Sequence, residues 1–345
     1  MAEKQKRKPR IAINGFGRIG RTIARIAKLH GNFDLVAVND LATSEQLAHA
    51  FRYDSVHGVY RGEVHLDGNT ITIDDDPFEA LQEPDPSRLP WNRLGIDYVV
   101  ECTGRFRKLD ELQMHLDAGA RRVLLSVPPK DKLDATVVLG VNDHVVKPSS
   151  TIISNASCTT NCAAPLAKVL HDKFGIRRGL LTTVHAYTAD QRLIDSPHSD
   201  PRRSRSAALN IVPTTTGAAR AIGEVLPELA GKLDGLAMRV PVPNGSLVDL
   251  TVELARDTTV DEINRAMQEA AQGSLRGILE YCTDPIVSTD IIGNPHSSIY
   301  DAALTTVIEG GLVKVVAWYD NEWGYSARME DLIVMLAKMD GLSPD

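Results

Sequence analysis

A glycine-rich turn between an apolar strand and an amphipathic helix constrains the fold of this chain more than any other feature. Residues 11–20 read IAINGFGRIG, an apolar run that breaks at Gly15, Gly17 and Gly20, and the next ten residues have helical apolar spacing. Glycines in this GxGxxG pattern permit a tight turn, close approach of the backbone to a pyrophosphate, and close packing of helix on strand. The segment therefore predicts the start of a Rossmann-type βαβ unit.

The end of the second predicted strand supports a dinucleotide site. The run LVAVND ends in Asp40, at the spacing from Gly20 that such sites show. A carboxylate here can accept hydrogen bonds from both hydroxyls of an adenosine ribose, and it repels a 2′-phosphate. A helix N-cap is the alternative role for Asp40. We expect the cofactor to be NAD and not NADP.

Length and strand pattern predict two domains. At 345 residues the chain exceeds what one hydrophobic core usually serves. Up to about residue 157 the candidate strands alternate with helix-like or loop segments, apart from a hairpin at EVHL and TITI, which is typical of a mostly parallel sheet. Beyond it, long β-branched segments favour an antiparallel sheet packed on helices. We expect an α/β fold with a basic tail at 1–10, a Rossmann domain at 11–157 joined by a C-terminal helix at about 324–340, and an α+β catalytic domain at 158–323.

Charge and cysteine content limit the partners of the chain. The formal net charge of -7 at pH 7 gives no general attraction to nucleic acid or anionic membranes. We find no run of about 18 apolar residues and no signal peptide. Four cysteines without zinc-type pairing indicate a reducing compartment. We expect a cytoplasmic protein with no membrane association, no dedicated nucleic-acid site and no metal.

Cys158 is the predicted nucleophile. In SNASCTTNC it follows a strand and begins an amphipathic helix, where backbone N–H groups and the helix dipole stabilise a thiolate. Cys162 lies one turn further into the helix, where the dipole is weaker, and we expect it to be structural. A metal or redox pair is the alternative reading of this CxxxC spacing, but no second cluster supplies further ligands.

His185, in TTVHAYT at a predicted strand end, is the best placed of ten histidines to exchange protons with Cys158. A histidine–thiolate ion pair would follow. A packed core or capping histidine is the alternative, although the adjacent threonines and tyrosine favour a site.

Segments spread over nearly the whole chain resemble one enzyme family. They are NGFGRIG, RYDSVHG, ECTGRF, SNASCTTNC, HAYT, PTTTGAA, MRVPVPN and WYDNEWGYS. Together they resemble phosphorylating glyceraldehyde-3-phosphate dehydrogenase, from about Ile11 to the final helix. SNASCTTNC with the downstream histidine is the most specific part of the resemblance.

The resemblance implies a reaction of glycolysis and gluconeogenesis. Cys158 would attack D-glyceraldehyde 3-phosphate, and His185 would accept the hydroxyl proton of the hemithioacetal. Hydride would pass to NAD, and inorganic phosphate would release 1,3-bisphosphoglycerate from the thioester. A homotetramer is also implied, with the loop RLIDSPHSDPRRSRSAALN at a subunit interface.

The resemblance further assigns binding residues. Hydroxyls and a backbone N–H can donate to phosphate oxygens, and arginine adds a bidentate cation. The substrate phosphate would be held by Thr188 and Arg239, and the incoming phosphate by Ser157, Thr160, Thr216 and Gly217. β-Propensity is the alternative reason for the threonines, and a surface ion pair for Arg239. Besides the glycines and Asp40, the cofactor would meet Arg18, Ile19, Ser126, Asn321 and Tyr325.

Some positions depart from the usual family pattern. SVPPK replaces a run similar to SAPAK, and Gly245 replaces a residue such as valine, which would loosen its strand. Ser196 stands where NAD-specific members often carry leucine, although Pro197 is retained, so we allow some tolerance of NADP.

Two other functions stay open. Erythrose-4-phosphate dehydrogenase shares the cysteine chemistry, but the threonines of HAYT and PTTTGAA favour the phosphorylating enzyme. A non-catalytic RNA- or protein-binding role on the same scaffold belongs to a different class, because fold alone does not fix function.

Overall fold

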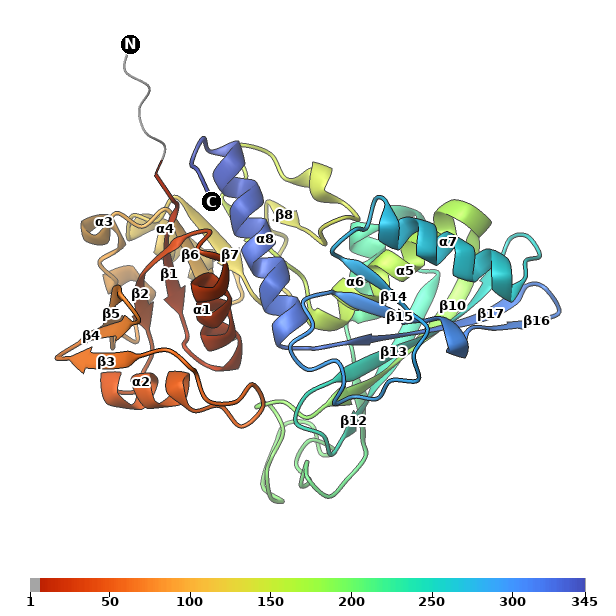
Figure 1. Ribbon diagram of the computed structural model, residues 1–345, viewed down its shortest axis with the longest axis horizontal. Coiled ribbons are helices and arrows are strands. Elements are labelled where there is room, and N and C mark those ends of the chain that lie inside the picture. The colour runs from red at the N-terminus through yellow and green to blue at the C-terminus, as the bar shows by residue number, and fades with distance from the viewer. Residues whose placement is uncertain (1–6, 345) are drawn as a thin grey trace, which may run out of the picture. The chain divides into compact units, whose positions relative to one another are not determined.

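The computed structural model describes residues 7–344, which form two compact units (Figure 1). The first unit contains the chain through Val137, His144–Ala156 and the residues from Ser326 on; the second contains Val138–Asp143 and Ser157–Tyr325. Of the predicted tail at 1–10, residues 1–6 lie outside the described residues. Arg7 forms an ion pair with Asp97, and Arg10 begins the first strand.

A nine-stranded sheet forms the centre of the first unit, in the order β3-β4-β5-β2-β1-β6-β7-β9-β8. All pairings from β5 to β8 along this order are parallel, whereas β3, β4 and β5 pair antiparallel. The predicted Rossmann-type sheet and the hairpin are confirmed; β5 was not predicted. The elements are β1 (Arg10–Asn14), α1 (Arg18–His30), β2 (Asp34–Asn39), α2 (Ser44–Arg52), β3 (Val64–Asp67), β4 (Thr70–Ile73), β5 (Asp76–Leu81), η1 (Pro86–Arg88), α3 (Trp91–Leu94), β6 (Tyr98–Glu101), α4 (Leu109–Asp117), β7 (Arg122–Leu125), β8 (Ala135–Thr136), η2 (Asp143–Val145) and β9 (Ile152–Ser154).

An eight-stranded sheet forms the second unit, in the order β11-β12-β10-β13-β17-β15-β14, with β16 beside β17. It is mainly antiparallel, as predicted, but β10 pairs with β12 and β14 with β15 in parallel. The elements are α5 (Cys158–Phe174), β10 (Ile176–Ala186), β11 (Val212–Thr215), α6 (Ala218–Val225), η3 (Pro227–Leu229), β12 (Leu233–Val240), β13 (Ser246–Leu254), α7 (Val260–Gln272), β14 (Leu279–Cys282), β15 (Ser298–Asp301), η4 (Ala302–Leu304), β16 (Thr306–Ile308) and β17 (Leu312–Tyr319).

The expectation that Gly245 loosens its strand is wrong. Gly245 precedes β13 and adopts a φ of 86°. A Cβ at this position would lie 2.3 Å from the carbonyl oxygen of Ser288. Glycine is therefore required here both by the backbone conformation and by the close approach of another segment.

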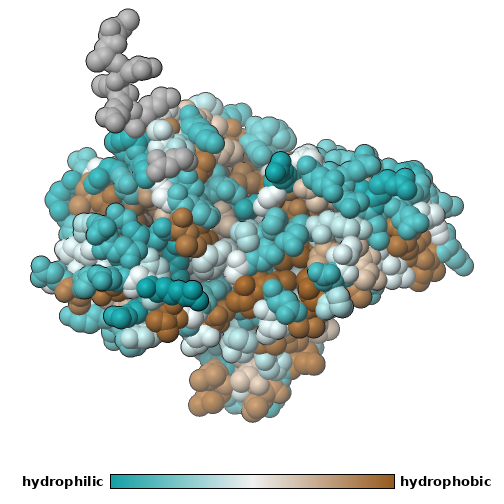
Figure 2. All heavy atoms as spheres, viewed as in Figure 1, coloured by the Kyte–Doolittle hydropathy of each residue, from teal (hydrophilic) through white to brown (hydrophobic). Residues whose placement is uncertain are grey.

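The loop between β10 and β11 carries an exposed apolar surface. Figure 2 shows apolar side chains (brown) gathered over this loop, which Figure 1 draws in green below β12. They include Leu193, Ile194, Leu209 and Ile211, each more than half exposed. Exposed apolar patches of this kind usually mark interaction surfaces.

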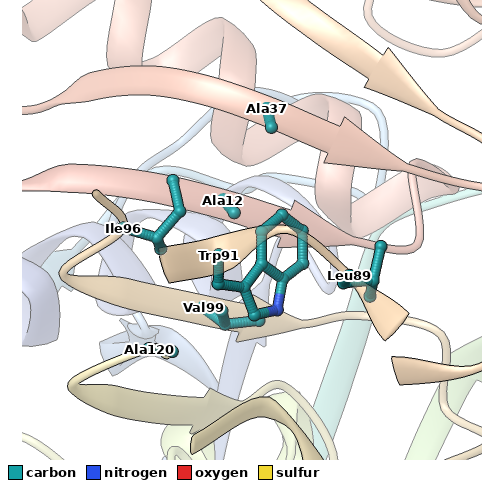
Figure 3. Close-up of a cluster of buried hydrophobic side chains, with 7 residues drawn as sticks. All are labelled: Ala12, Ala37, Leu89, Trp91, Ile96, Val99 and Ala120. Atoms are coloured by element: carbon teal, nitrogen blue, oxygen red, sulfur yellow. The ribbon is translucent and has the colours of Figure 1, made fainter. Parts of the chain in front are cut away.

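One core cluster of the first unit surrounds Trp91, which has no exposed surface. Figure 3 shows its indole ring among the small side chains of Ala12 and Ala37 and beside Val99. Alanines on β1 and β2 leave room for the large ring to lie against the sheet. The ring nitrogen, a donor only, donates to His115 Nδ1 over 3.1 Å.

Helix α8 (Trp323–Met339) has buried residues at helical spacing, including Met329, Leu332, Ile333 and Leu336. The predicted C-terminal helix is therefore confirmed, and from Ser326 on it belongs to the first unit. No helix among residues 7–344 has both the length and the apolar character needed to cross a membrane.

A buried carboxylate anchors the end of α8. Asp340 accepts hydrogen bonds from Arg122 Nε (2.8 Å) and Nη2 (2.5 Å), and from the Tyr98 hydroxyl (2.7 Å). The side chains of Asp340 and Arg122 are both 2% exposed. Burial opposes ionisation of Asp340, but the bonds from Arg122 and Tyr98 outweigh it and lower the pKa of this carboxyl.

We expect Asp340→Ala to lower the free energy of unfolding by about 3–5 kcal/mol, because it leaves the Arg122 guanidinium buried without its counter-ion. Urea unfolding followed by circular dichroism measures the change. Asp67→Ala, at an exposed strand end, is the control and should cost less than about 0.5 kcal/mol. Equal urea concentrations at the midpoint of unfolding for the two variants would contradict this role of Asp340.

Candidate active site

The glycine turn lines a cavity of about 310 Å³ in the first unit. Gly15 has a φ of 95°, and a Cβ there would lie 2.6 Å from the Thr103 backbone nitrogen. A Cβ at Gly20 would lie 2.3 Å from the Gly15 carbonyl oxygen, whereas nothing lies within 4 Å of the Cβ position at Gly17. The turn thus packs tightly against the protein but leaves open space at the N-terminus of α1, where a pyrophosphate fits.

Asp40 lines the same cavity. Its Oδ2 accepts from the Phe16 N–H (2.8 Å) and its Oδ1 from the Ala42 N–H (3.2 Å). The N-cap of α2 is Thr43, so the alternative role of Asp40 as a helix cap is wrong. The carboxylate is held at the edge of the cavity, as ribose recognition requires.

Several other residues line this cavity to which the sequence analysis assigned no role. They include Asn14, Asn39, Thr103, Arg105 and Phe106. Arg18 and Ile19 lie in the first turn of α1, where Arg18 forms an ion pair with Asp54. Ser126 is buried directly after β7, and its N–H donates to the Glu101 carbonyl (3.0 Å).

Cys158 is the first residue of α5, in the second unit. The N-cap is Ser157, whose Oγ accepts from the Thr160 N–H at 3.1 Å and lies 2.7 Å from the Thr160 hydroxyl. The Cys158 sulfur lies 3.5 Å from His185 Nε2. Cys162 is fully buried, with its sulfur near the Ser298 hydroxyl (3.7 Å), and takes no part in this pair.

His185 lies near the end of β10, directly opposite Arg239 in the parallel pairing of β10 with β12. His185 Nδ1 lies 2.7 Å from the Ala186 carbonyl oxygen, which can only accept. Arg239 Nη1, which can only donate, lies 3.0 Å from the same His185 Nδ1, but it has two other acceptors, the Ala186 carbonyl (3.1 Å) and the Thr188 hydroxyl (2.9 Å). These contacts assign the proton to Nδ1 and leave Nε2 as the acceptor that faces the Cys158 sulfur.

The burial of Cys158 and His185 acts against the charged forms of the expected histidine–thiolate ion pair. Burial, followed by the charge of Arg239, lowers the pKa of His185 to about 3. Burial also raises the pKa of the Cys158 thiol, against the charge of Arg239 and the N–H groups of the helix terminus, which lower it. Desolvation thus opposes both charged forms, whereas Arg239 and the N–H groups of the helix terminus favour the thiolate, and the ion pair stays a prediction.

A cluster of cations and hydroxyls lies beside this pair. The Thr188 hydroxyl accepts from Arg239 and donates to Asp190, which also accepts from Arg203 Nη1 (2.5 Å). Within residues 7–344, the buried Nε of Arg239 has no hydrogen-bond partner. An orphaned guanidinium nitrogen next to a hydroxyl suits a phosphate. The sequence did not single out Asp190 as part of this cluster.

Thr216 and Gly217 lie at the start of α6, where Gly217 is the N-cap and the Thr216 hydroxyl accepts from the Ala218 N–H (3.2 Å). The space around the Cβ position of Gly217 is open to 4 Å. Among residues 7–344, no group of three or more His, Cys, Asp or Glu side chains could hold a metal ion.

Comparison with known proteins decides the family. A model described as "Glyceraldehyde 3-phosphate dehydrogenase, NAD binding domain" matches residues 9–109, and one described as "Glyceraldehyde 3-phosphate dehydrogenase, C-terminal domain" matches residues 157–321. The chain belongs to the glyceraldehyde-3-phosphate dehydrogenase family. The glyceraldehyde-3-phosphate dehydrogenase of Mycolicibacterium smegmatis is 56% identical over 337 residues, which is 95% of this chain and 98% of the relative. Glyceraldehyde-3-phosphate dehydrogenase 1 of Bacillus subtilis is 53% identical, and the enzyme of Borreliella burgdorferi 54%; the matches cover 95% of this chain and 98% and 100% of the relatives.

Membership of this family makes the chain an NAD-dependent oxidoreductase that acts on an aldehyde group. The resemblance seen in the sequence is therefore confirmed, as is NAD as cofactor. The relatives do not favour the erythrose-4-phosphate alternative, and a purely non-catalytic role has no support.

Asn321 is held by a serine that the sequence did not reveal. The Ser246 hydroxyl donates to Asn321 Oδ1 (2.8 Å) and accepts from the Ala186 N–H (3.1 Å). This bond fixes which way round the Asn321 amide lies. Because Ala186 follows His185, one hydroxyl links the predicted nicotinamide ligand to the backbone beside the predicted base. Tyr325 is buried in the first turn of α8.

We expect Ser246→Ala to raise the KM for NAD about tenfold, because it leaves the Ala186 N–H and Asn321 Oδ1 without their partner and so frees the Asn321 amide to reorient. Steady-state rates at saturating aldehyde measure it. Ser297→Ala is the matched control, since the Ser297 hydroxyl is also buried but has no partner among the described residues. An unchanged KM in Ser246→Ala would exclude the positioning role.

Proposed function

We propose that this chain oxidises D-glyceraldehyde 3-phosphate, with NAD and inorganic phosphate, to 1,3-bisphosphoglycerate through a thioester on Cys158. One observation carries the proposal: a thiol at a helix N-terminus lies 3.5 Å from a histidine nitrogen whose other ring nitrogen is already bonded. That arrangement supplies a nucleophile and its base. The adjacent Arg239 and Thr188 suit a phosphorylated aldehyde.

The first step is attack of Cys158 on the aldehyde carbon. The S–C bond forms as the C=O π bond breaks, and the thiol proton passes to His185 Nε2. The developing oxyanion can accept from the Cys158 backbone N–H and from the protonated imidazole. Transfer of the proton to this oxygen gives a hemithioacetal and returns a neutral His185. Since the pKa of His185 is low, the imidazolium gives up its proton readily.

The second step is oxidation of the hemithioacetal. His185 Nε2 takes the hydroxyl proton while the C–H bond breaks and the C=O bond re-forms. When bound, NAD supplies the acceptor for the hydride. The product is a thioester on Cys158, which retains the free energy of the oxidation.

The third step is phosphorolysis. An oxygen of inorganic phosphate attacks the thioester carbon, the C–S bond breaks, and His185 returns its proton to the sulfur. We assign the substrate phosphate to Thr188 and Arg239. We assign the incoming phosphate to Ser157, Thr160, Thr216 and Gly217, which lie at the N-termini of α5 and α6, where N–H groups favour anions.

The cavity of the first unit suits the adenosine and pyrophosphate parts of NAD. The residues that would hold the cofactor are Gly15, Gly17, Arg18, Ile19, Gly20, Asp40 and Ser126, with Asn321 and Tyr325 toward the nicotinamide. Asp40 disfavours the 2′-phosphate of NADP by charge repulsion. We therefore propose a preference for NAD with residual use of NADP.

Initial rates with glyceraldehyde 3-phosphate and erythrose 4-phosphate, each with NAD or NADP and with or without phosphate, test the proposal. We expect the highest kcat/KM with glyceraldehyde 3-phosphate, NAD and phosphate, and a kcat/KM at least about tenfold lower with NADP because of Asp40. Release of the free acid at millimolar phosphate would contradict the second anion site. A higher kcat/KM with NADP would contradict the role of Asp40.

Cys158→Ser should abolish oxidation and keep NAD binding, whereas Cys282→Ser, the same change at a thiol outside the site, should keep activity. Full activity in Cys158→Ser would rule out the covalent route.

We also propose a homotetramer. Besides the apolar side chains of the β10–β11 loop, Leu180, Leu236 and Leu312 are exposed on β10, β12 and β17. Apolar surface on a sheet and on a long loop suits burial between copies of the chain.

Light scattering should give a mass of four chains, and Leu209→Asp, at an 82% exposed loop position, should reduce it. Leu29→Asp, at an exposed position on α1, is the control. A monomeric wild-type protein would contradict the proposal.

We place the enzyme in the cytoplasm because its four cysteines are free; recovery with membranes in cell fractionation would count against this.

A further inference from the structure

Glu101, the last residue of β6, carries a carboxylate with no exposed surface. A buried carboxylate is costly unless its oxygens are hydrogen-bonded. It takes no part in the chemistry proposed above, and the sequence analysis gave it no role beyond its place in the motif ECTGRF. Its partners therefore indicate what it does.

Four donors converge on this carboxylate. Asn14 Nδ2 donates to Oε2 (2.5 Å), and the Thr103 N–H donates to Oε1 (2.7 Å). The Thr103 hydroxyl also donates to Oε1. His115 Nε2 lies 3.2 Å from Oε2. Both oxygens are thus occupied by donors from β1, α4 and the segment after β6.

The Trp91 indole fixes the donor role of His115. An indole N–H can only donate, so His115 Nδ1, 3.1 Å away, must accept. The imidazole then carries its proton on Nε2, which points at Glu101. Because Trp91 lies in the apolar cluster of Figure 3, the packed core sets this tautomer.

The other partners of Glu101 form the wall of the dinucleotide cavity. Asn14 and Thr103 both line it. The Thr103 nitrogen that Glu101 binds is the atom nearest to the Cβ position of Gly15, at 2.6 Å. Asn14 Oδ1 accepts from Asn39 Nδ2 (2.7 Å), and Asn39 also lines the cavity. One carboxylate therefore holds the end of β1 and the segment after β6 around the glycine turn, and Asn14 connects it to the end of β2.

We propose that Glu101 is a positioning residue for NAD binding, which holds Asn14 and Thr103 in the arrangement that receives the adenosine half of the cofactor. The proposal rests on the proposed function only in taking NAD as the cofactor. Glu101 acts through its two partners and touches neither the nicotinamide nor the reacting carbon. It therefore determines cofactor affinity and not the rate of hydride transfer.

Glu101→Gln tests this in the full-length enzyme. Glutamine keeps the size of the side chain but replaces one acceptor oxygen by an NH2 group, which then faces a donor of Asn14, Thr103 or His115. We expect the Kd for NAD and the Kd for ADP-ribose, both measured by calorimetry, to rise about tenfold or more. The kcat at saturating NAD should stay within about twofold. Glu79→Gln, on β5 in an exposed ion pair with Arg93, is the matched control and should change none of these values.

Thr103→Val provides a second variant, which removes the hydroxyl that donates to Glu101 and accepts from the Arg105 N–H (3.0 Å). If that hydroxyl acts through Glu101, the two changes should not be independent. The fold-rise in the Kd for NAD of the double variant should then be smaller than the product of the fold-rises of the two single variants. Two results would overturn the proposal and leave Glu101 a structural residue. One is that the effects of the two changes on the Kd for NAD are independent. The other is that Glu101→Gln lowers the Tm but leaves the Kd for ADP-ribose unchanged. Because calorimetry measures the binding of NAD and ADP-ribose without turnover, its result does not depend on the proposed aldehyde oxidation. Failure of that oxidation would be seen in the initial rates instead.

Discussion

The parallel pairing of β10 with β12 is the constraint on which the catalytic unit depends. It places His185 opposite Arg239 in register, so that the guanidinium lies within hydrogen-bond distance of the imidazole, the Ala186 carbonyl and the Thr188 hydroxyl. A cation held this close to a buried histidine disfavours the imidazolium. The same cation, with its unbonded Nε, can receive a phosphate. One strand pairing thereby sets both the basicity of His185 and the location of an anion site.

The burial of Cys158 and His185 opposes charge separation between them. Charge separation before substrate arrives would have to be supported in surroundings that disfavour both ions. Proton transfer during attack avoids that cost, because the negative charge moves to the substrate oxygen, where N–H donors are available. The N–H groups of the helix terminus can serve both purposes, since they lower the pKa of the Cys158 thiol and can stabilise negative charge on the bound substrate.

In the first unit, the Glu101 carboxylate is enclosed by hydrogen-bond donors. Gly15 allows the segment after β6 to approach the turn, and Glu101 holds that segment in place. The tautomer of His115 that completes the carboxylate's partners is set by Trp91, a residue of the apolar core. Packing in the core and polar contacts at the cavity wall are thus connected through the Trp91–His115 hydrogen bond.

The sequence by itself determined the local features of this protein. The glycine spacing, Asp40, Cys158 at a helix start and the periodicity of α8 could all be predicted, because each depends on residues close together in the chain. Only the tertiary structure decided the parallel pairing of β10 with β12, the partners Asp190, Ser246 and Glu101, and the need for glycine at position 245. It also supplied the burial and the Arg239 charge that shift the pKa values of Cys158 and His185. Protonation, like these contacts, depends on burial and on charges from distant segments, and no local pattern of residues records them.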